Sequence, residues 1–582
     1  MKDFFKDNKR AEWLAFALFI VLYILISIFH EPMYDEAQAW MIARDASWKQ
    51  LLFEIPHYEG HPPFWHLILA VFAKAGVPFE LGLRIPGAIF CITSVWLLIF
   101  RSPFPKAVKC LLPFTYYIFF RYSIVVRPYC MTMLGLFLVA LNYQKKHEKP
   151  FRFMASLLLL CASSAYGMAF AAGICIVWII ELFTEIKRNY ASQIVALSVL
   201  LVLNVGQLLL MLPKEDTNSV VVWSISTVIY GLIYMFLLGP ADSMFLDTGM
   251  DARLQNYAQG IVAGGVSSYI NILIGAVTVV ILLYYARKYR KTLLMVIPYT
   301  LFAMFSAAVY FWYHHIGLIH LFIIFVFWCA LSSNKGMVKK HNSEMKQGDE
   351  AENTGEIKQI KDTDSIKQEK LRSPNKIIPT NIKRKLSVLA LCLCLGMSLG
   401  WSIFCAGTDL LKTTWYTRDL AKTIVEIGAD RGNCALQWEI VPIGPFEFAE
   451  DYTDASKYSH IPSVTQFFDC LAYFDENIFY NHNEGIKEIS YNRQLLPDGE
   501  AQARIMEANA THGYPEYFIG LVYVLDALPI EEEMPAYAPV YRFEVYKPDK
   551  FIIDYNDRYI YAREDIYQQR SDWPILEQLS LE

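Results

Sequence analysis

Apolar runs close to twenty residues long recur through the first 405 positions of the chain, and they constrain its fold more than any other feature. A helix of about 20 apolar residues spans the hydrocarbon core of a bilayer. The composition agrees, because 55% of the 582 residues are hydrophobic and only 19% are charged, against about 25% charged residues in a typical soluble chain. The sequence therefore predicts a polytopic α-helical membrane protein. The net charge of −5 gives no indication of nucleic acid as a partner.

Positive charge predicts how these runs thread the membrane, because cytoplasmic loops carry an excess of Lys and Arg. Placing every basic cluster in the cytoplasm gives about eleven spans, in a range of roughly 10 to 13, with the N-terminus inside and the C-terminus outside. The first run is expected to be an uncleaved anchor helix, since the bulky, acidic "HEPMYDEAQ" after it offers no cleavage site. The expected spans are 11–29, 85–100, 107–120, 128–143, 152–165, 168–183, 191–212, 263–286, 292–310, 316–333 and 386–405.

Two apolar stretches fall outside this threading. The segment 62–76, "PPFWHLILAVFAKAG", opens with Pro-Pro and is too short to span, so we expect an outer helix that lies in the membrane interface. The segment 221–239, "VVWSISTVIYGLIYMFLLG", is long enough to span but would need a partner helix to keep both termini on their predicted sides. Its assignment stays open.

The threading divides the chain into four parts. Residues 1–333 form the transmembrane part, and they include a long first outer loop at 30–84. Residues 334–385 have no aromatic side chain and mix Lys, Glu, Asp, Asn and Gln, so they are expected to form a disordered cytoplasmic loop. Residues 386–405 form the last span, and residues 406–582 form a small soluble domain outside the membrane.

The C-terminal domain mixes helical and strand patterns. The stretch "TRDLAKTIVEI" has the period of a helix, whereas "CALQWEIVPI", "YFIGLVYVLDAL" and "VYRFEVYKP" are typical of strands. This alternation predicts a small α/β domain. Of the eleven cysteines, only Cys434 and Cys470 fall in this polar region, and a disulfide between them stays an open alternative.

A pair of carboxylates, Asp35 and Glu36, follows the first apolar run. Locally, Asp35 is expected to be the N-cap of a helix over 36–47, with Gln38 closing a capping box. Ionisable groups next to a bilayer are costly and usually functional. A capping role is compatible with catalysis, because a capped carboxylate is held rigidly. The pair is therefore a candidate for acid–base chemistry at the outer membrane face.

A second group of polar residues lies in "HYEGHPPFWH", which brings together Glu59, His57, His61 and His66. The alternative to a binding role is a loop stiffened by the two prolines before a helix. The histidines lack the fixed spacing of a metal site. No metal and no other cofactor is predicted, and a divalent metal stays an unsupported alternative.

Cations from three later segments are expected on the same face: Arg84, Arg127, and the pair His314 and His315. An anionic lipid headgroup needs cations, and Arg fits phosphate through two parallel hydrogen bonds. Each of these residues also suits an interfacial anchor whose charge reaches the lipid headgroups. That simpler role is the one we expect for Arg121.

In this order, "YDEAQAWMIARD", "EGHPPFWHLILAVFAKAG", "LRIPGA", "VRPYCMTMLGLFLVAL" and "HHIGLIHLFIIFVFW" resemble the GT-C superfamily of integral-membrane glycosyltransferases. The similarity is greatest to the branch that contains the protein O-mannosyltransferases and the lipid A aminoarabinose transferase. It covers roughly residues 11–333, and the polar tail attached through one more span also resembles bacterial members. No single motif is specific, so the order of the set carries the resemblance.

The resemblance implies a polyprenyl-phosphate-linked sugar as donor, with its headgroup at the outer face. It implies that Asp35 is the base that activates the acceptor and that Glu36 completes the acidic pair. Glu59 and His61 match the acidic and basic positions of the family's x-HPP segment, which implies contact with the acceptor or the sugar.

The resemblance also implies a site for the donor phosphate. Arg84 matches an arginine implicated at the lipid phosphate, and Arg127 matches an Arg-Pro-Tyr position. His315 and Gly317 match an Arg-His-x-Gly pattern. His314 stands where arginine is usual, and this departure weakens its assignment to the phosphate site.

We therefore expect a multi-pass enzyme of the cell membrane that transfers a sugar to a hydroxyl of a glycan, lipid or protein on the outer face, with inversion. Asp35 would take the proton of the acceptor, and Arg84 and Arg127 would stabilise the departing phosphate. The alternative is a transporter or lipid flippase, which the lack of an internal repeat and the gathering of charge at one face disfavour. A non-catalytic membrane anchor is the third interpretation.

Overall fold

The computed structural model describes residues 9–184, 190–217, 225–245, 266–311, 313–333, 380–411, 415–436, 438–442, 458–462, 468–479, 486–487, 489–491, 507, 510–511, 513–520, 535–547, 552–570 and 573. In this part, six helices are long and apolar enough to cross a membrane: α1 (Arg10–Phe29), α6 (Phe79–Arg101), α10 (Ala165–Thr184), α11 (Tyr190–Met211), the helix Ile316–Ser333, and Val388–Leu411 within α18 (Thr380–Leu411). The prediction of a polytopic helical membrane protein is confirmed. The total number of spans stays a prediction.

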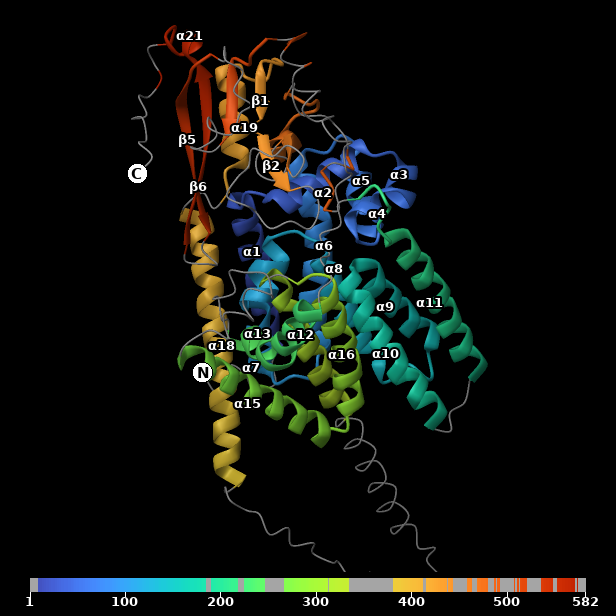
Figure 1. The fold of residues 1–582 in the computed structure, drawn as a ribbon. Helices are drawn as coiled ribbons and strands as arrows, with labels where there is room; N and C mark the ends of the chain where they lie inside the picture. The colour runs from blue at the N-terminus through green and yellow to red at the C-terminus, as the bar shows by residue number, and fades with distance from the viewer. Residues whose placement is uncertain are drawn as a thin grey trace, which may run out of the picture.

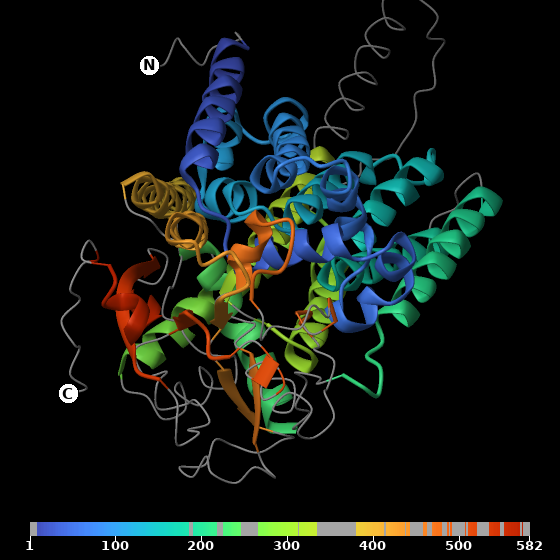
Figure 2. The same cartoon turned by 90° about the horizontal axis from the view of Figure 1, so that it is seen from above.

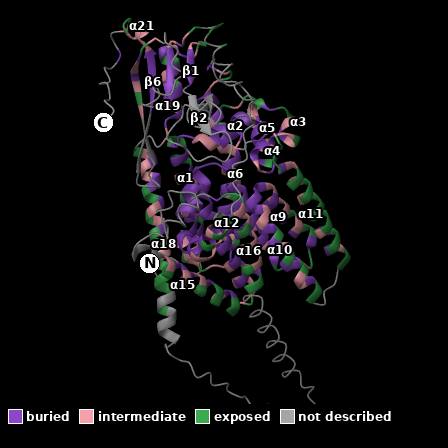
Figure 3. Ribbon diagram, in the orientation of Figure 1, coloured by how far each residue is buried: buried purple, intermediate pink, exposed green. Residues whose placement is uncertain are grey.

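The remaining apolar helices pack against these six. They are α8 (Tyr129–Tyr143), α9 (Pro150–Ser163), α15 (Val266–Lys288) and α16 (Thr292–Ala308). Exposed residues cover much of α11, α15 and α18, as Figure 3 shows. On α11 the exposed side chains include Leu201 and Val202, which are 65% and 70% exposed. Apolar side chains on the outside of a helix are suited to contact with lipid, where the backbone is already satisfied within the helix.

The expected span 107–120 is wrong, because no continuous helix covers it. The chain forms α7 (Lys106–Leu111), a 3-10 turn η1 (Leu112–Phe114) and a π-helix η2 (Tyr117–Ile124). Pro113 lies inside the turn, and a proline cannot donate the hydrogen bond that a continuous helix needs. Arg121 belongs to η2 and is only 5% exposed. The expectation that Arg121 is an interfacial anchor is therefore wrong.

The open segment 221–239 is described from residue 225. It forms α12 (Ile225–Ile233), a π-helical turn η3 (Tyr234–Leu238) and α13 (Gly239–Phe245). The predicted disordered loop 334–385 lies outside the described residues except for its last six positions, which belong to α18.

The first outer loop is itself helical. It contains α2 (Tyr34–Asp45), α3 (Trp48–Phe53), α4 (Ile55–Glu59) and α5 (Phe64–Ala73). The ten-residue α5 is the expected short apolar helix and is too short to span. These helices lie together at one end of the helical body, next to the C-terminal domain (Figure 1).

The predicted start of α2 is off by two residues. Met33 is the N-cap, and Glu36, not Gln38, occupies the third helical position and accepts the Met33 N–H at 2.9 Å. The expected capping box is therefore wrong in register, because Glu36 supplies the capping carboxylate and Asp35 has no part in the cap. Acidic side chains in the first turn of a helix also interact favourably with the helix dipole.

Basic residues gather at the other end of the helical body. Lys146, after α8, forms an ion pair with Glu181 of α10 at 2.6 Å, and its Nζ lies 4.0 Å from the centre of the Tyr143 ring. Lys291, before α16, lies 5.0 Å from the same ring. The basic stretches that contain them, 145–152 and 287–291, are two of those that the threading placed in the cytoplasm, and they lie at the same end of the helical body. Which side of the membrane this end faces stays a prediction.

The C-terminal part contains the expected small α/β domain. The helix α19 (Thr417–Ile427) has the predicted bounds, and Gly428 ends it with a φ of 76°, a left-handed conformation that suits glycine. A four-stranded sheet has the order β1 (Cys434–Leu436), β4 (Tyr517–Gly520), β6 (Ile552–Arg563), β5 (Tyr537–Lys547). β1 and β4 are parallel, and the other neighbours are antiparallel.

Two further strands, β2 (Trp438–Pro442) and β3 (Tyr458–Pro462), form an antiparallel pair, and short helical turns lie at η5 (Phe468–Tyr473) and α21 (Glu564–Tyr567). The strands β3 and β6 were not predicted. In β6 the sequence "IIDYNDRYIYAR" interrupts its apolar residues with Asp and Asn, which are depleted in strands. Cys434 and Cys470 are buried free thiols.

Polar contacts attach the C-terminal domain to the outer loop. Nε and Nη2 of Arg418 in α19 each donate at 2.7 Å to Glu80 at the start of α6, and the Tyr473 hydroxyl donates to the same carboxylate at 2.8 Å. Arg44 of α2 donates to the carbonyl oxygens of Leu471 and Phe474 at 3.1 and 2.5 Å. Figure 2 looks down on this end, where the orange segment of the C-terminal domain lies against the blue α2.

A buried histidine joins three elements next to this interface. His30 follows α1, and its Nδ1 lies 2.7 Å from Asp409 of α18 while its Nε2 lies 3.4 Å from Glu36 of α2. Burial by itself would lower the pKa of His30, but the carboxylates of Asp409 and Glu36 outweigh burial and raise the pKa to about 10. The imidazolium form is therefore stabilised by folding.

The raised pKa of His30 predicts that the folded protein loses stability at alkaline pH. A folded-state pKa of about 10, above the ordinary value near 6.5, stabilises the protein fully below pH 6.5, and the stabilisation disappears as the pH rises to 10. In detergent, His30→Gln should lower stability at pH 6.5 by roughly 1–3 kcal/mol, the cost of removing a buried hydrogen bond to a charged group, and by less at pH 9.5. Thermal unfolding at both pH values measures this. An equal decrease at both would contradict it.

Candidate active site

The centre of the candidate site is a buried ion pair between Asp35 and Arg127. Nη1 of Arg127 lies 2.8 Å from Oδ2 of Asp35, and both side chains are at most 15% exposed. The hydroxyl of Tyr491, from the C-terminal domain, donates to Oδ1 of Asp35 at 2.9 Å and accepts from Nη2 of Arg127 at 3.1 Å. An acid of the outer loop, a cation before α8 and a phenol of the C-terminal domain therefore meet at one point.

Glu36 lies beside Asp35 but has a different role in the fold. Its side chain is buried, and Oε1 accepts the Val126 N–H at 2.7 Å while Oε2 accepts the Met33 N–H at 2.9 Å. Val126 directly precedes Arg127, so this contact fixes the loop that carries the arginine. Both oxygens of Glu36 are thereby used to hold backbone, and the residue positions the Asp35–Arg127 pair.

Arg127 is enclosed by aromatic residues. Its guanidinium lies 5.2 Å from the centre of the Tyr129 ring, a distance at which a cation is attracted to the ring face. Burial would lower the pKa of Arg127, but the Asp35 carboxylate outweighs burial and raises it above its ordinary value. Pro128 is the N-cap of α8 and orients the start of this helix. Arg127 is therefore a permanent positive charge in a site largely closed to water.

The two histidines predicted near the phosphate reach this arginine through Tyr129. The Tyr129 hydroxyl lies 2.7 Å from Nε2 of His315, and the rings of His314 and His315 lie 4.0 Å apart. Burial, together with the charge of Arg127, lowers the pKa of both histidines well below the ordinary value. They are neutral imidazoles at physiological pH, and they bring hydrogen-bonding capacity to the site without charge.

A glycine brings this histidine pair close to the site. A Cβ at Gly317 would lie 2.6 Å from the Tyr122 hydroxyl, which itself donates to the carbonyl of His314 at 2.8 Å. Glycine is therefore required for the helix Ile316–Ser333 to approach η2 this closely.

Glu59 forms the second half of the site. It is the last residue of α4, and Gly60, with a φ of 62°, turns the chain after it. Nε2 of Gln38 donates to Oε1 of Glu59 at 3.2 Å, and the backbone N–H of Tyr491 donates to the same oxygen at 3.2 Å. Burial raises the pKa of Glu59 to about 8, although the hydrogen bonds from the C-terminal segment oppose the rise. Glu59 is therefore mainly a neutral acid at pH 7.

Next to Glu59 lie polar atoms that are buried without a hydrogen-bond partner in the part of the chain that the structure describes. They are Oε1 of Gln38, Nδ1 of His61 and Nε2 of His66. The His66 nitrogen lies 3.8 Å from Glu59, too far for a hydrogen bond. Burial, then the charge of Arg127, lowers the pKa of His61 to about 4, so this ring is neutral. Unsatisfied buried polar groups are costly and often mark a place for a polar ligand or water.

Arg84 lies apart from the Asp35–Arg127 pair. Its Nη2 donates to the carbonyl of His30 at 2.6 Å and lies 2.7 Å from Glu80 on the same helix. It belongs to the contacts that attach the C-terminal domain, and it connects to the site through His30 and Glu36. The predicted site residues are thus brought to one end of the molecule, with Arg84 at the periphery.

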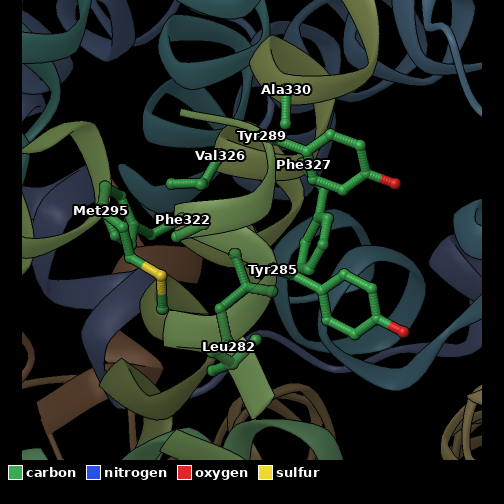
Figure 4. A pocket seen from close by; sticks show the side chains of 10 residues that line it. Leu282, Tyr285, Tyr289, Met295, Phe322, Val326, Phe327 and Ala330 are labelled. Carbon is green, nitrogen blue, oxygen red and sulfur yellow. The ribbon is translucent and has the colours of Figure 1, made fainter. Parts of the chain in front are cut away.

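Among the residues that the structure describes, no group of three or more His, Cys, Asp or Glu side chains is arranged to hold a metal ion. A separate pocket lies between α15, α16 and the helix Ile316–Ser333 (Figure 4). Its lining includes Leu282, Met295, Phe322 and Phe327 and holds no carboxylate or cation. It is an apolar crevice between helices, unlike the polar site around Asp35.

Sequence reasoning missed Tyr491. It lies 456 residues after Asp35, in a stretch of the polar domain with no periodicity or motif. Gln38 was noticed only as a helix-capping residue, yet it contacts both Glu59 and the carbonyl of Ile489. For Gln38, its position two residues after the acidic pair on the same helix is the sequence signal that pointed toward the site.

No family model matches the sequence, and no curated protein matches it. The arabinofuranosyltransferase AftD from Mycobacteria, solved by cryo-EM, matches with a TM-score of 0.38 and 15% identity over 96% of this chain and 40% of that chain. ArnT from Cupriavidus metallidurans, crystallised with undecaprenyl phosphate, matches with a TM-score of 0.44 and 11% identity over 95% of this chain and 98% of that chain. This chain spans about two fifths of the length of AftD. At these values the likeness establishes no activity for this chain.

Proposed function

We propose that this protein is a membrane glycosyltransferase that moves a sugar from a polyprenyl-phosphate donor to a hydroxyl acceptor at the outer membrane face. The observation that carries the proposal is the buried pair of Asp35 and Arg127, a carboxylate beside a permanent cation at the end of the helical body that contacts the C-terminal domain. Such a pair supplies the two functions that the reaction needs. The resemblance of the sequence to GT-C enzymes agrees with it.

In the proposed step, the acceptor oxygen attacks the anomeric carbon of the sugar while Asp35 takes its proton. The bond between that carbon and the phosphate oxygen breaks, and polyprenyl phosphate leaves with the electron pair. Attack opposite to the leaving group inverts the anomeric centre. A carboxylate that accepts a proton in this way contributes about 10²–10⁴-fold. No general acid is essential, because a phosphate is already a good leaving group.

Arg127 is the proposed partner of the departing phosphate. Its fixed charge is buried, and electrostatic stabilisation is strong where water is excluded. His314 and His315 would add hydrogen bonds as neutral imidazoles. Arg84 is proposed for the outer edge of the phosphate site, where its contacts with Glu80 and His30 leave it 19% exposed.

Glu59 and His61 are the proposed sugar-binding residues. Glu59 is buried and His61 is half-buried beside Asp35 and Arg127, and the unpartnered atoms of Gln38, His61 and His66 provide hydrogen-bonding positions for hydroxyl groups. A neutral Glu59 can donate as well as accept a hydrogen bond, which suits a sugar hydroxyl better than a second carboxylate would.

Reconstitution tests the proposal. The purified protein in lipid nanodiscs is incubated with a panel of tritiated polyprenyl-phosphate sugars and with cell-envelope fractions as acceptor, and mass spectrometry compares envelope glycans of cells with and without the protein. We expect loss of one envelope sugar in the cells and its transfer in the nanodiscs. Unchanged glycans together with no transfer from any donor would overturn the proposal.

The pKa of Glu59 predicts the alkaline limit of activity. With a pKa of about 8, Glu59 loses its proton as the pH rises through 8 and adds a negative charge next to Asp35 and the donor phosphate. Transfer by the wild type should therefore fall above pH 8, whereas Glu59→Gln, neutral at every pH, should lack that decline. Initial rates from pH 6 to 9.5 measure this. The same decline in both proteins would exclude Glu59 as its cause.

A further inference from the structure

The C-terminal domain inserts three consecutive residues, 489–491, into the candidate site. The carbonyl of Ile489 accepts from Nε2 of Gln38 at 2.7 Å. The backbone N–H of Tyr491 donates to Glu59 at 3.2 Å, and its hydroxyl donates to Asp35 at 2.9 Å. Two carboxyl groups of the site, those of Asp35 and Glu59, therefore contact this segment, which makes it part of the site and more than a docking surface.

The segment supplies one of the two polar side-chain contacts of Asp35 among the described residues. Oδ2 faces Nη1 of Arg127 at 2.8 Å, and Oδ1 accepts the Tyr491 hydroxyl at 2.9 Å. A general base must lie within hydrogen-bond reach of the proton that it takes. Each oxygen has a further lone pair, but the Asp35 side chain is only 15% exposed with these partners in place, so an acceptor hydroxyl gains room at Asp35 when one of the two partners moves away.

Replacement of Tyr491 is much cheaper than replacement of Arg127. Separating the buried Asp35–Arg127 pair would leave two charges uncompensated, which costs several kcal/mol. Exchanging the Tyr491 hydroxyl for another hydroxyl replaces one neutral donor by another at the same oxygen of Asp35, and the incoming oxygen can also accept from Nη2 of Arg127 in place of the phenol. Burial, then Asp35, raises the pKa of Tyr491 above its ordinary value, so the phenol keeps its proton and stays a donor.

We propose that the Tyr491 hydroxyl occupies the position of the acceptor hydroxyl at Asp35, and that the acceptor enters by displacing it. This inference rests on the proposed function and deepens it, because it assigns the C-terminal domain a direct role in the site. With the acceptor absent, the phenol keeps water away from the base. Water at that position would attack the anomeric carbon, pass a proton to Asp35, and release free sugar and polyprenyl phosphate.

Tyr491→Phe tests the proposal, because it removes the hydroxyl and keeps the ring. In nanodiscs with the labelled polyprenyl-phosphate sugar that supports transfer, we expect the ratio of donor hydrolysis to transfer to rise roughly tenfold, the factor for one hydrogen bond to a charged group. The KM for the acceptor should fall, and kcat should change little. The matched control is Tyr517→Phe, since the Tyr517 hydroxyl donates to the carbonyl of Ile427 inside the C-terminal domain. The control should behave as the wild type.

A structural role for Tyr491 gives a different result. If the hydroxyl only holds Asp35 in place, Tyr491→Phe lowers kcat and leaves both the hydrolysis ratio and the acceptor KM unchanged, which overturns the proposal. Hydrogen exchange of the wild type gives a measurement without a variant. Addition of the acceptor should speed exchange of the Tyr491 amide, and unchanged exchange also overturns the proposal. If neither transfer nor hydrolysis occurs in the wild type with any donor, the proposed function itself has failed.

Discussion

Asp35→Asn is expected to lower transfer by about 10²–10⁴-fold, the contribution of a positioned general base. The amide has nearly the shape of the carboxylate and can still accept from Tyr491, but it cannot take a proton from the acceptor. The decrease should therefore appear in kcat, with little change in the KM for the lipid donor. Initial rates with purified protein and the labelled donor measure it.

The matched control for this substitution is Asp45→Asn. Asp45 ends the same helix, its side chain is 43% exposed, and it pairs with Arg44 at 2.6 Å at the surface. An exposed pair of this kind contributes little to stability, so the control should keep wild-type transfer. Undiminished transfer by Asp35→Asn would exclude Asp35 as the base and remove the central argument for the proposed function.

Arg127→Gln is expected to lower transfer by about 10²–10³-fold, the usual cost of removing one group that stabilises developing negative charge. In contrast to the Asp35 substitution, it should also raise the KM for the donor, because the phosphate loses a cation in the ground state as well. The control is Arg101→Gln, since Arg101 is exposed at the end of α6 and lies 5.7 Å from the Trp96 ring, away from the site.

The substitution of Arg127 also tests the cost of an uncompensated charge. Breaking a buried ion pair on one side costs about 3–5 kcal/mol, so Arg127→Gln should unfold at a lower temperature than the wild type. The double variant Asp35→Asn/Arg127→Gln contains two neutral amides and should regain much of that stability without regaining transfer. If Arg127→Gln kept normal donor KM and kcat, the arginine would have no role at the phosphate.

Local sequence predicted the helix bounds correctly where the length of an apolar run or the period of a helix determines the structure. The bounds of α19 were predicted to the residue, since its apolar positions Leu420, Ala421, Ile424 and Ile427 fall on one buried face. The helices α1, α11 and Ile316–Ser333 were predicted within about two residues, within the usual scatter of helix ends. A long apolar run in a bilayer has no other way to satisfy its backbone.

Prediction failed where a helix-breaking proline inside an apolar run was passed over, and where a neighbour far along the chain decided the outcome. Pro113 and the close packing of η2 divide a stretch that looked like one span, and Arg121 is buried there. The capping role moved from Asp35 to Glu36 by a shift of the helix start, because Glu36 also has to reach the Val126 N–H. The helix propensity of the residues around Glu36 contains no information about its hydrogen bond to Val126.

The sequence by itself determined that this is a multi-helix membrane protein with a small α/β domain, because apolar run length and side-chain period act within one segment. It also pointed to Asp35 and Arg127 as separate candidates. Only the tertiary structure decided that they form one buried pair, that Glu36 supports them, and that Tyr491 completes the site. The reason is physical: charge compensation inside a protein depends on which groups share a closed space, and that space is made by segments hundreds of residues apart.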